Sequence, residues 1–290
     1  MIILDFSQVC LSNIMVSIGK VDGVNIEENL IRHMVLNSIR LYKTKFGAEY
    51  GEMIIACDNK NYWRRQLFPY YKANRKKSQA ASDLDWKAIF ECLNKIREEL
   101  KEYFPYRVID VDTAEADDII GTLCATHGTE EEFMEFQGVK KILILSGDKD
   151  FIQLARFKNV KQYDPVRKKF IVHSDPIAYL NEHVMRGDVG DGIPNVLSTD
   201  NCFVVGERQK PLTQKRLDAL LSGDVMPTEV ARNYMRNKQL IDLTMIPAEV
   251  SGKIIQSYND QSGKKNGKNL MNYFIANRLK HLTESIGDFL

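Results

Sequence analysis

The chain has 290 residues and a mass of 33.3 kDa, enough for one large or two modest domains with a substantial core. Forty Lys and Arg residues balance 39 Asp and Glu residues, and the formal net charge of +1 excludes a protein that finds nucleic acid or anionic lipid through bulk charge. Any polyanion binding must come from a local patch. A hydrophobic share of 44% with 27% charged residues excludes the disordered and fibrous classes.

The five cysteines are scattered, with no C-x-x-C pair and no Cys/His cluster at zinc spacing. This pattern argues against a disulfide scaffold and a structural zinc site, and it favours a reducing, intracellular compartment. No apolar run approaches the roughly 18 residues of a membrane span, so we expect no membrane partner. The N-terminus meets a carboxylate at Asp5 without a basic region, which indicates a buried strand rather than a signal peptide.

Short apolar runs that each lead into an acidic residue predict strands buried on both faces. These runs span residues 1–4, 53–57, 108–111 and 142–145. Helical periodicity lies between them, over residues 25–47, 83–103 and 114–128. Asn25 with Glu28 would cap the first of these helices, and Gly47 would end it. The alternation predicts an α/β fold with a mostly parallel central sheet flanked by helices.

The pattern changes after Asp175-Pro176, where an Asp cap precedes a proline at the first helical position. Helical periodicity dominates from there to the C-terminus. We therefore expect an α/β domain over residues 1–173 and a smaller all-helical domain over residues 174–290. Residues 263–268 read as a loop, which is one residue short of a phosphate-binding loop and lacks its Ser or Thr.

Acidic residues follow three of the predicted strands. Asp5, Asp58 and Asp148 would converge on one crevice if their strands are neighbours, because ligands of parallel sheets bind outside the carboxyl ends of the strands. Asp150 adds a fourth carboxylate from a Gly-Asp-Lys-Asp turn. The acidic stretch 115–118 adds more at a predicted helix start, where acids are also ordinary caps.

Helical spacing puts Glu115 and Asp118 on one side and Asp117 on another, unless Glu115 lies before the regular helix begins. Two like charges about 4 Å apart repel by roughly 1 kcal/mol in water and about 4 kcal/mol at an effective dielectric near 20, so such a cluster requires cations. Oxygen ligands without Cys or His predict Mg²⁺ or Mn²⁺, which can stabilise the attacking and leaving oxygens of a phosphodiester displacement. The alternative is that each acid only caps a helix or ends a strand in water.

A basic and aromatic stretch without any acid spans residues 59–82. Its basic residues are Lys60, Arg64, Arg65, Lys72, Arg75, Lys76 and Lys77, and its aromatic residues are Tyr62, Trp63, Phe68, Tyr70 and Tyr71. Because the stretch begins one residue after Asp58, we expect it to overhang the acidic crevice, with cations on phosphates and aromatic faces on unpaired bases. The alternative is a solvated loop whose aromatic residues, Phe68 among them, pack on the core.

A glycine-rich segment with two aspartates, residues 187–194, follows the predicted helix 175–186. Exposed backbone amides and carbonyls in such a turn can hold a phosphate or a monovalent cation. A tight turn between domains is the alternative.

Taken together, these residues resemble the 5′-nuclease (flap endonuclease) superfamily. The motifs, in chain order, are Leu-Asp5, Cys-Asp58, Glu115-Ala-Asp117-Asp118, Ser-Gly-Asp148-Lys-Asp150 and Gly-Asp188-Val-Gly-Asp191-Gly-Ile-Pro. Within the superfamily the chain looks, nearly end to end, like the ribonucleases H of T-even bacteriophages. That likeness rests on Asp5-Phe-Ser-Gln, Tyr62-Trp-Arg-Arg65, Tyr71-Lys-x-Asn-Arg75, Val160-Lys-Gln and Leu282-Thr-x-Ser-Ile. It implies a PIN-like nuclease core.

The resemblance also implies two divalent ions, Mg²⁺ with Mn²⁺ as a substitute. The first would be held by Asp5, Asp58, Glu115 and Asp117, and the second by Asp117, Asp148, Asp150 and Asp191. Accessory acids acting through water would be Asp118 and Asp188. The basic stretch, extended to residues 59–100, would be the arch or bridge for the 5′ single strand, with Lys72 and Arg75 nearest the scissile phosphate. The implied nucleic-acid contacts are Arg64, Arg65, Tyr71, Lys76, Lys77, Gly190 and Gly192, and the glycine-rich segment would grip duplex backbone, with a possible K⁺.

The activity implied is Mg²⁺-dependent 5′→3′ exonuclease and flap endonuclease action on RNA–DNA hybrids and on duplex DNA with a 5′ end or flap. The enzyme would clear RNA primers from lagging-strand fragments in the cytoplasm of a phage-infected bacterium. We expect a monomer, with a single-stranded-DNA-binding protein, docked on residues 174–290, and a sliding clamp as further partners.

The chain departs from cellular members of the superfamily at residues 195–210, which lack their Gly-x-Gly-x-x-x-Ala continuation, and neither end carries a clear clamp-binding tail. Two alternatives remain open. A toxin-type PIN ribonuclease would share the acidic core, but the second domain argues against it. A catalytically silent flap-binding or single-strand-binding protein would have lost acids, and none is missing here.

Overall fold

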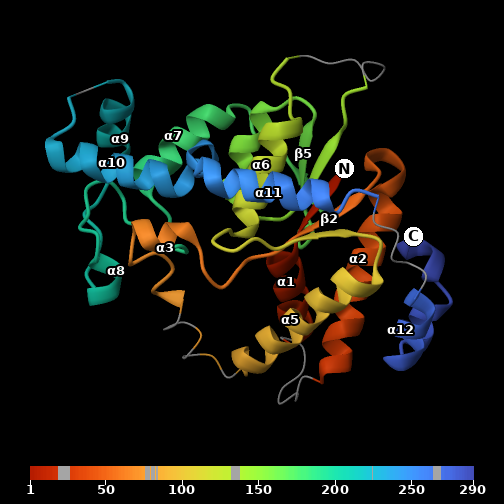
Figure 1. The fold of residues 1–290 in the computed structure, drawn as a ribbon. Helices are drawn as coiled ribbons and strands as arrows, with labels where there is room; N and C mark the ends of the chain where they lie inside the picture. The colour runs from red at the N-terminus through yellow and green to blue at the C-terminus, as the bar shows by residue number, and fades with distance from the viewer. Residues whose placement is uncertain are drawn as a thin grey trace.

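A six-stranded sheet in the order β3-β2-β1-β4-β5-β6 forms the centre of the computed structural model (Figure 1). The structure describes residues 1–18, 27–75, 79, 82, 84–131, 138–223, 225–263 and 269–290, without the side chains of residues 17 and 18. The strands are β1 Ile2–Asp5, β2 Met53–Ala56, β3 Arg107–Ile109, β4 Ile142–Leu145, β5 Val160–Asp164 and β6 Lys169–Ile171. All neighbouring pairs are parallel except β5 and β6. The predicted α/β class with a mostly parallel sheet is confirmed.

The elements that were not predicted include two strands and the first helix. β5 reads Val-Lys-Gln-Tyr-Asp, and β6 is a short edge strand with two exposed residues, so neither is a continuous apolar run. Both strands take their stability from pairing with β4 and with each other rather than from a local pattern. The helix α1, Phe6–Ile18, begins directly after β1, where the sequence shows no turn signal.

The sheet separates two hydrophobic cores, and β1 contributes to both. Ile2 and Leu4 lie in one core, and Ile3 lies in the other, because successive side chains of a strand point to opposite faces. Helices α1, α2 Glu28–Tyr50 and α5 Trp86–Tyr103 cover the first face. On the second face lie α6 Ala116–His127, the 3₁₀ helix η2 Lys149–Arg156 and α11 Ala248–Asp260 (Figure 1). This two-sided burial explains the continuous apolar runs.

Helix boundaries agree with the sequence in some places and not in others. Asp175 caps the predicted helix by accepting a hydrogen bond from the Ala178 amide at 2.9 Å. Gly47 does not end α2, which runs on to Tyr50 and stops at Gly51, where φ is 80°. A glycine weakens a helix interior without ending it, whereas a left-handed residue does end it. The predicted cap Asn25 and the predicted loop at residues 264–268 lie outside the described residues.

From residue 176 onward, the elements of the described chain are all helices joined by loops. Its remaining elements are α7 Pro176–Arg186, α8 Cys202–Val205, α9 Gln214–Leu221, α10 Thr228–Ile241, η3 Leu243–Met245, α12 Leu270–Ala276, α13 Lys280–Thr283 and η5 Ile286–Phe289. Side chains of α7, α9 and α10 form small clusters of their own. The last helices pack into the core on the first face of the sheet. There the rings of Phe274 and Phe289 contact the ring of Phe104, with centroids 6.1 and 5.7 Å apart. The helical region therefore shares cores with the sheet.

All five cysteines are buried free thiols, in agreement with the prediction of no disulfide scaffold. Within the described ranges we find no helix with the length and apolar character needed to cross a bilayer.

Candidate active site

The carboxyl ends of β1, β2 and β4 bring three aspartates to one edge of the sheet. Asp5 is the last residue of β1, where it pairs with Ala56 of β2, and Leu4 pairs with Leu145 of β4. Asp58 and Asp148 follow the ends of those two neighbouring strands. The condition for convergence, that these strands are neighbours, is met by the strand order β2-β1-β4.

The carboxylates of this acidic cluster act on one another. Burial, followed by the charges of Asp58 and Asp148, raises the pKa of Asp5 to about 7. Burial and the charge of Asp148 raise the pKa of Asp150 to about 8. Burial also raises the pKa of Asp117 well above its ordinary value, and Asp148 and Asp5 add to this effect. Acids that lie far apart in the sequence therefore share one site.

Two polar side chains hold the strand ends in place. The Ser146 hydroxyl donates to Oδ2 of Asp5 at 2.9 Å and accepts the Asp148 amide at 3.2 Å. Gln162 of β5 donates from Nε2 to the backbone carbonyls of Ser146, at 2.9 Å, and of Asp148, at 2.5 Å. Sequence reasoning missed both, because their roles follow from the pairing of β4 with β5.

Glu115 is the residue before α6, so it lies outside the regular helix, and its charge reaches Asp117 in the first turn. Because Glu115 lies before the regular helix, Glu115 and Asp117 can face the same site. Asp58 fastens this helix start by accepting the Ala116 amide on Oδ1 at 2.9 Å. Asp118 behaves differently. It is 0% exposed, and its carboxylate accepts the Glu115 amide at 2.9 Å.

Asp118 also lies 2.8 Å from the Arg64 guanidinium and accepts the Trp63 indole N–H at 3.2 Å. With its oxygens enclosed in this way, Asp118 serves as a helix cap and a counter-ion. Its role as an accessory metal acid stays a prediction.

Arg64 and Tyr71 were predicted to contact nucleic acid, and both side chains are buried beside the acidic cluster, so these contacts stay predictions. Arg64 is 2% exposed and donates to Glu115 at 3.0 Å and to the Leu240 carbonyl at 2.8 Å. Tyr71 is 1% exposed, and its hydroxyl lies within hydrogen-bond distance of Glu115, at 3.1 Å, and of Asp191, at 2.8 Å. Both side chains therefore hold residues of the acidic cluster in place through buried hydrogen bonds.

Lys72 and Arg75 lie at the cluster. The Lys72 ammonium is 2.5 Å from Oε1 of Glu115 and 3.5 Å from Oδ2 of Asp191. Burial opposes the charged form of this lysine, but Asp191 and Glu115 raise its pKa overall, so Lys72 stays protonated. The half-exposed Arg75 reaches Oδ1 of Asp191 at 2.5 Å. Their roles toward a scissile phosphate stay predictions.

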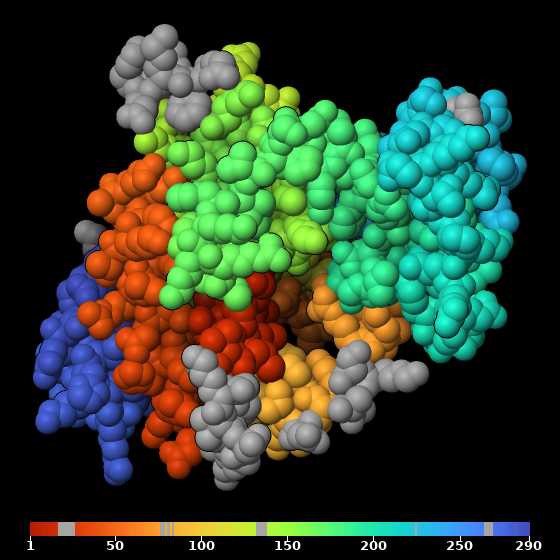
Figure 2. Space-filling model, turned by 180° about the vertical axis from the view of Figure 1, so that it is seen from behind, coloured from red at the N-terminus to blue at the C-terminus, as the bar shows by residue number. Residues whose placement is uncertain are grey.

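The first half of the basic stretch, α3 Trp63–Leu67 and the turns after it, is anchored on the body of the protein. Phe68 is 3% exposed and packs with residues of α7 and α10, as the core-packing alternative expected. Arg65 remains exposed and lies over the Tyr62 ring. The face in Figure 2 is hollowed where the red N-terminal, orange and green segments meet, and these are the segments that supply the cluster. Lys76 and Lys77 lie outside the described residues.

The glycine-rich segment packs against this anchored turn. The Lys72 amide donates to the Asp191 carbonyl at 2.7 Å, and the Asn74 side chain donates to the Val189 carbonyl at 2.8 Å. Gly192 is buried at φ 72°, and a Cβ there would lie 3.0 Å from the Tyr70 carbonyl. The predicted contact of Gly192 with nucleic acid stays a prediction, and the close approach of the Tyr70 carbonyl explains why a glycine is needed there. Gly190 is exposed, and its predicted contact remains untested.

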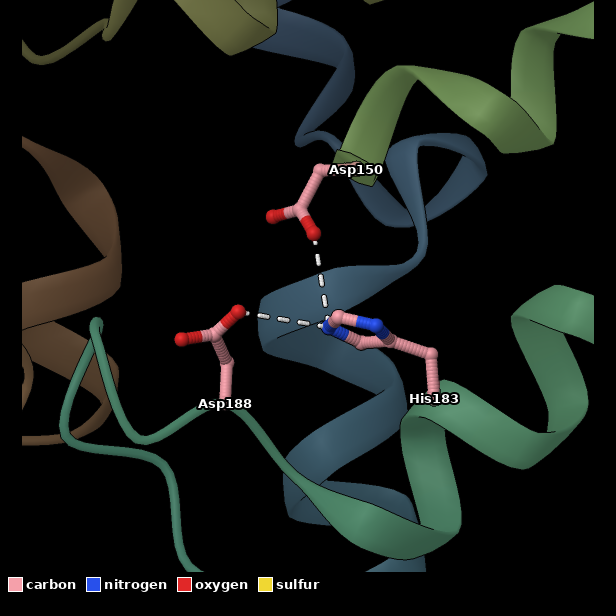
Figure 3. A group of neighbouring side chains, drawn as sticks. All are labelled: Asp150, His183 and Asp188. Carbon is pink, nitrogen blue, oxygen red and sulfur yellow. Dashed lines mark ion pairs between the residues drawn. The ribbon is translucent and has the colours of Figure 1, made fainter. Parts of the chain in front are cut away.

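His183 was missed by the sequence reasoning. It lies in the last turn of α7, and its Nε2 is 3.3 Å from Oδ1 of Asp150 and 3.5 Å from Oδ2 of Asp188 (Figure 3). Burial by itself lowers the pKa of His183, but the carboxylates of Asp188 and Asp150 raise it overall. A single histidine in an amphipathic helix carries no sequence signal for this position.

The donor set fits hard divalent cations. The cluster offers carboxylate oxygens from several elements, which is the ligand type that Mg²⁺ and Mn²⁺ take. Burial is the main cause of the raised pKa values of Asp5, Asp117 and Asp150, and repulsion from neighbouring carboxylates, Asp148 among them, adds to each. Added positive charge would relieve this repulsion.

Comparisons with known proteins agree with this geometry. Residues 20–184 match the family model of the 5′-3′ exonuclease N-terminal resolvase-like domain, and residues 176–289 match the model of the T4 RNase H C-terminal domain. A ribonuclease H of Enterobacteria phage T4 is 34% identical over an alignment of 300 residues, covering 99% of this chain and 95% of that protein. A 5′-3′ exonuclease of Buchnera aphidicola is 29% identical over 153 residues, covering 50% of this chain and 47% of that protein.

Among solved structures, a bacteriophage T5 flap endonuclease in complex with DNA and metal ions shares the fold with a TM-score of 0.61 at 18% identity, covering 90% of this chain and 98% of that one. A T5 5′-exonuclease with bound zinc gives a TM-score of 0.60 at 17% identity, with the same coverage. The sheet, the acidic strand ends and the two family matches lead to one conclusion. The chain belongs to the 5′-3′ exonuclease family of nucleases.

Proposed function

We propose that the chain is a Mg²⁺-dependent 5′→3′ exonuclease and flap endonuclease that acts on RNA–DNA hybrids and on duplex DNA with a 5′ end or flap. The observation that carries the proposal is the convergence of acids from the ends of β1, β2 and β4 and the start of α6. Beside them lie two cations, Lys72 and Arg75, on a turn anchored next to the cluster.

In this proposal two groups of carboxylates hold two ions. The first group is Asp5, Asp58, Glu115 and Asp117, and the second is Asp117, Asp148, Asp150 and Asp191. When bound, divalent ions lower the pKa of water and neutralise charge on the leaving oxygen. Ser146 and Gln162 orient the strand ends that carry these ligands. The T5 relatives with bound metal ions support a metal-dependent reaction.

Lys72 and Arg75 would bind the scissile phosphate of the substrate. Arg75 is 52% exposed and bound to a single carboxylate, so a phosphate can replace Asp191 as its partner. Lys72 contributes a fixed positive charge from within the cluster, where a preorganised cation stabilises negative charge that develops in the transition state. The exposed Lys60 and Arg65 extend the positive surface along the backbone of the substrate.

We infer a role in clearing RNA primers from lagging-strand fragments, in the cytoplasm of a phage-infected bacterium, from the likeness to the phage T4 ribonuclease H. A monomeric enzyme with residues 1–173 as the nuclease domain and 174–290 as the helical domain would meet a single-stranded-DNA-binding protein and a sliding clamp there. We do not extend the proposal to K⁺ at the glycine-rich segment. The carbonyls of Asp188, Val189 and Asp191 already accept hydrogen bonds from the chain's own donors.

The decisive experiment assays Asp117→Asn and Asp148→Asn on a 5′-labelled RNA–DNA duplex with and without Mg²⁺. Each variant removes a ligand charge, and we expect turnover to fall at least about 10²-fold. Asp110→Asn is the matched control, because Asp110 follows β3 but pairs with Lys101 and Asn59 outside the cluster. It should cleave at the wild-type rate. Wild-type turnover in both cluster variants would refute the metal assignment.

A product-length assay on flap, nick and RNA-primer substrates separates the activities. Binding without any cleavage would favour a silent flap-binding protein, and cleavage confined to single-stranded RNA would favour a toxin-type ribonuclease. Lys72→Ala combined with Arg75→Ala should reduce turnover at saturating Mg²⁺ with the fold intact. An unchanged rate would refute the role given to these cations.

A further inference from the structure

The group formed by Asp150, His183 and Asp188 stands out within the acidic cluster because it contains a nitrogen donor (Figure 3). The three side chains come from η2, from the end of α7 and from the segment after it. Their potential ligand atoms all lie within 4.8 Å of one another. Among the described residues, these three side chains lie close enough together to hold a metal ion.

The distances in this group suit coordination to one ion. Two ligands bound at about 2.1 Å lie about 3.0 Å apart in octahedral and about 3.4 Å apart in tetrahedral geometry. Nε2 of His183 lies 3.3 Å from Asp150 and 3.5 Å from Asp188. These two distances match the spacing of neighbouring ligands on one ion, and the third pair of atoms, from Asp150 and Asp188, lies within 4.8 Å.

Two of the three atoms face each other as an ion pair but have no hydrogen-bond partner. Nε2 of His183 and Oδ1 of Asp150 are both shielded from solvent and make no hydrogen bond. The side chains themselves are 14% and 15% exposed, so the protein, rather than water, surrounds them. Buried polar atoms are rarely left unpaired, and a bound ion would supply the missing partner to both at once.

A purely structural role for the imidazole, as a hydrogen-bond donor, explains only one of the two short distances. Nε2 carries at most one hydrogen, so it can donate to only one of the two carboxylates at a time. Asp150 lies 3.3 Å and Asp188 lies 3.5 Å from Nε2, so a single proton on this nitrogen accounts for only one of the two contacts. A metal ion between the three groups explains both distances together.

We propose that His183, with Asp150 and Asp188, forms a metal position with a nitrogen ligand, which takes Mn²⁺, Co²⁺ or Zn²⁺ more tightly than Mg²⁺. Imidazole suits the later first-row ions, whereas sites made only of oxygen suit Mg²⁺. The inference deepens the proposed metal centre and rests on Asp150 being part of it. It assigns a ligand that the acidic motifs of the sequence do not contain.

The test uses the full-length, metal-free chain and Mn²⁺ as the probe. Pulsed electron paramagnetic resonance of the Mn²⁺ complex should show a ¹⁴N coupling from one imidazole, which changes to a ¹⁵N coupling when the histidines are labelled. His183→Gln should lose this coupling and bind Mn²⁺ about tenfold more weakly at that position, with Mg²⁺ affinity changed less than about twofold. His281→Gln, at an exposed site on α13, is the matched control and should keep both properties.

Several results would overturn the assignment. Wild-type protein without nitrogen coupling would refute it directly, without reliance on any variant. A folded His183→Gln protein, checked by circular dichroism, that retains the coupling would do the same. The nuclease assay remains a separate readout: a chain that shows the coupling but does not cleave an RNA–DNA duplex would refute the proposed function and leave the ligand in place.

Discussion

Replacing Arg64 with methionine tests whether this residue stabilises the fold rather than contacting nucleic acid. Its guanidinium lies 2.8 Å from Asp118, 3.0 Å from Glu115 and 2.8 Å from the Leu240 carbonyl. Methionine keeps much of the volume but removes the charged partner of the buried Asp118, whereas Glu115 keeps its ion pair with Lys72. Removing one partner of a buried ion pair costs about 3–5 kcal/mol, and an unpaired buried carbonyl costs about 1–3 kcal/mol. Because a freed carboxylate can take up a proton, we expect a loss of about 4 kcal/mol.

The assay is equilibrium unfolding in urea followed by circular dichroism, together with a thermal melt. A loss of that size corresponds to a melting temperature lower by about 8 °C in a protein of this length. Arg65→Met is the matched control, because Arg65 is adjacent in sequence but exposed, and its stability should change by less than about 0.5 kcal/mol. Combining Arg64→Met with Asp118→Asn should recover part of the loss, since the pair is coupled.

A different outcome would refute this reasoning. If Arg64→Met unfolds like the wild type but binds a flap duplex more weakly, with a smaller dependence on salt, then Arg64 contacts phosphate. The burial of its side chain would in that case not describe the substrate complex.

Two further predictions concern the site without metal and the glycine-rich segment. Burial raises the pKa of Asp5 to about 7 and of Asp150 to about 8, so the metal-free fold holds these protons more tightly than the unfolded chain. Since the ordinary pKa of an aspartate is 3.8, the melting temperature in EDTA should fall as the pH rises from about 4 to about 8, and Mg²⁺ should remove most of that fall; a flat profile in EDTA would count against the cluster. Gly187→Ala should cost more than about 2 kcal/mol, because φ is 68° and the new Cβ would lie 2.3 Å from the Ile193 carbonyl. Gly51→Ala, at φ 80° with open space around it, should cost only about 1 kcal/mol, and equal losses in urea unfolding would contradict the steric argument.

Much of the fold followed from local patterns. The four buried strands could be predicted because both faces of each are covered, which makes each strand a continuous apolar run. β6 could not be predicted in this way, because its first two residues are exposed and its place at the sheet edge comes from pairing with β5. The stop predicted at Gly47 was wrong because the residue that takes the left-handed conformation is Gly51.

The acidic cluster was predictable for a physical reason: the carboxyl ends of parallel strands meet at one edge, so Asp5, Asp58 and Asp148 had to converge once the strand order was β2-β1-β4. The sequence did not show which basic side chains of the stretch 59–82 point into the protein and which point to solvent. Arg64 and Arg65 are adjacent and chemically identical, yet one is buried and the other exposed. That choice depends on partners far along the chain, such as the Leu240 carbonyl 176 residues away. Amino-acid type and spacing determined that an anionic site exists, and tertiary packing alone decided which side chains complete it.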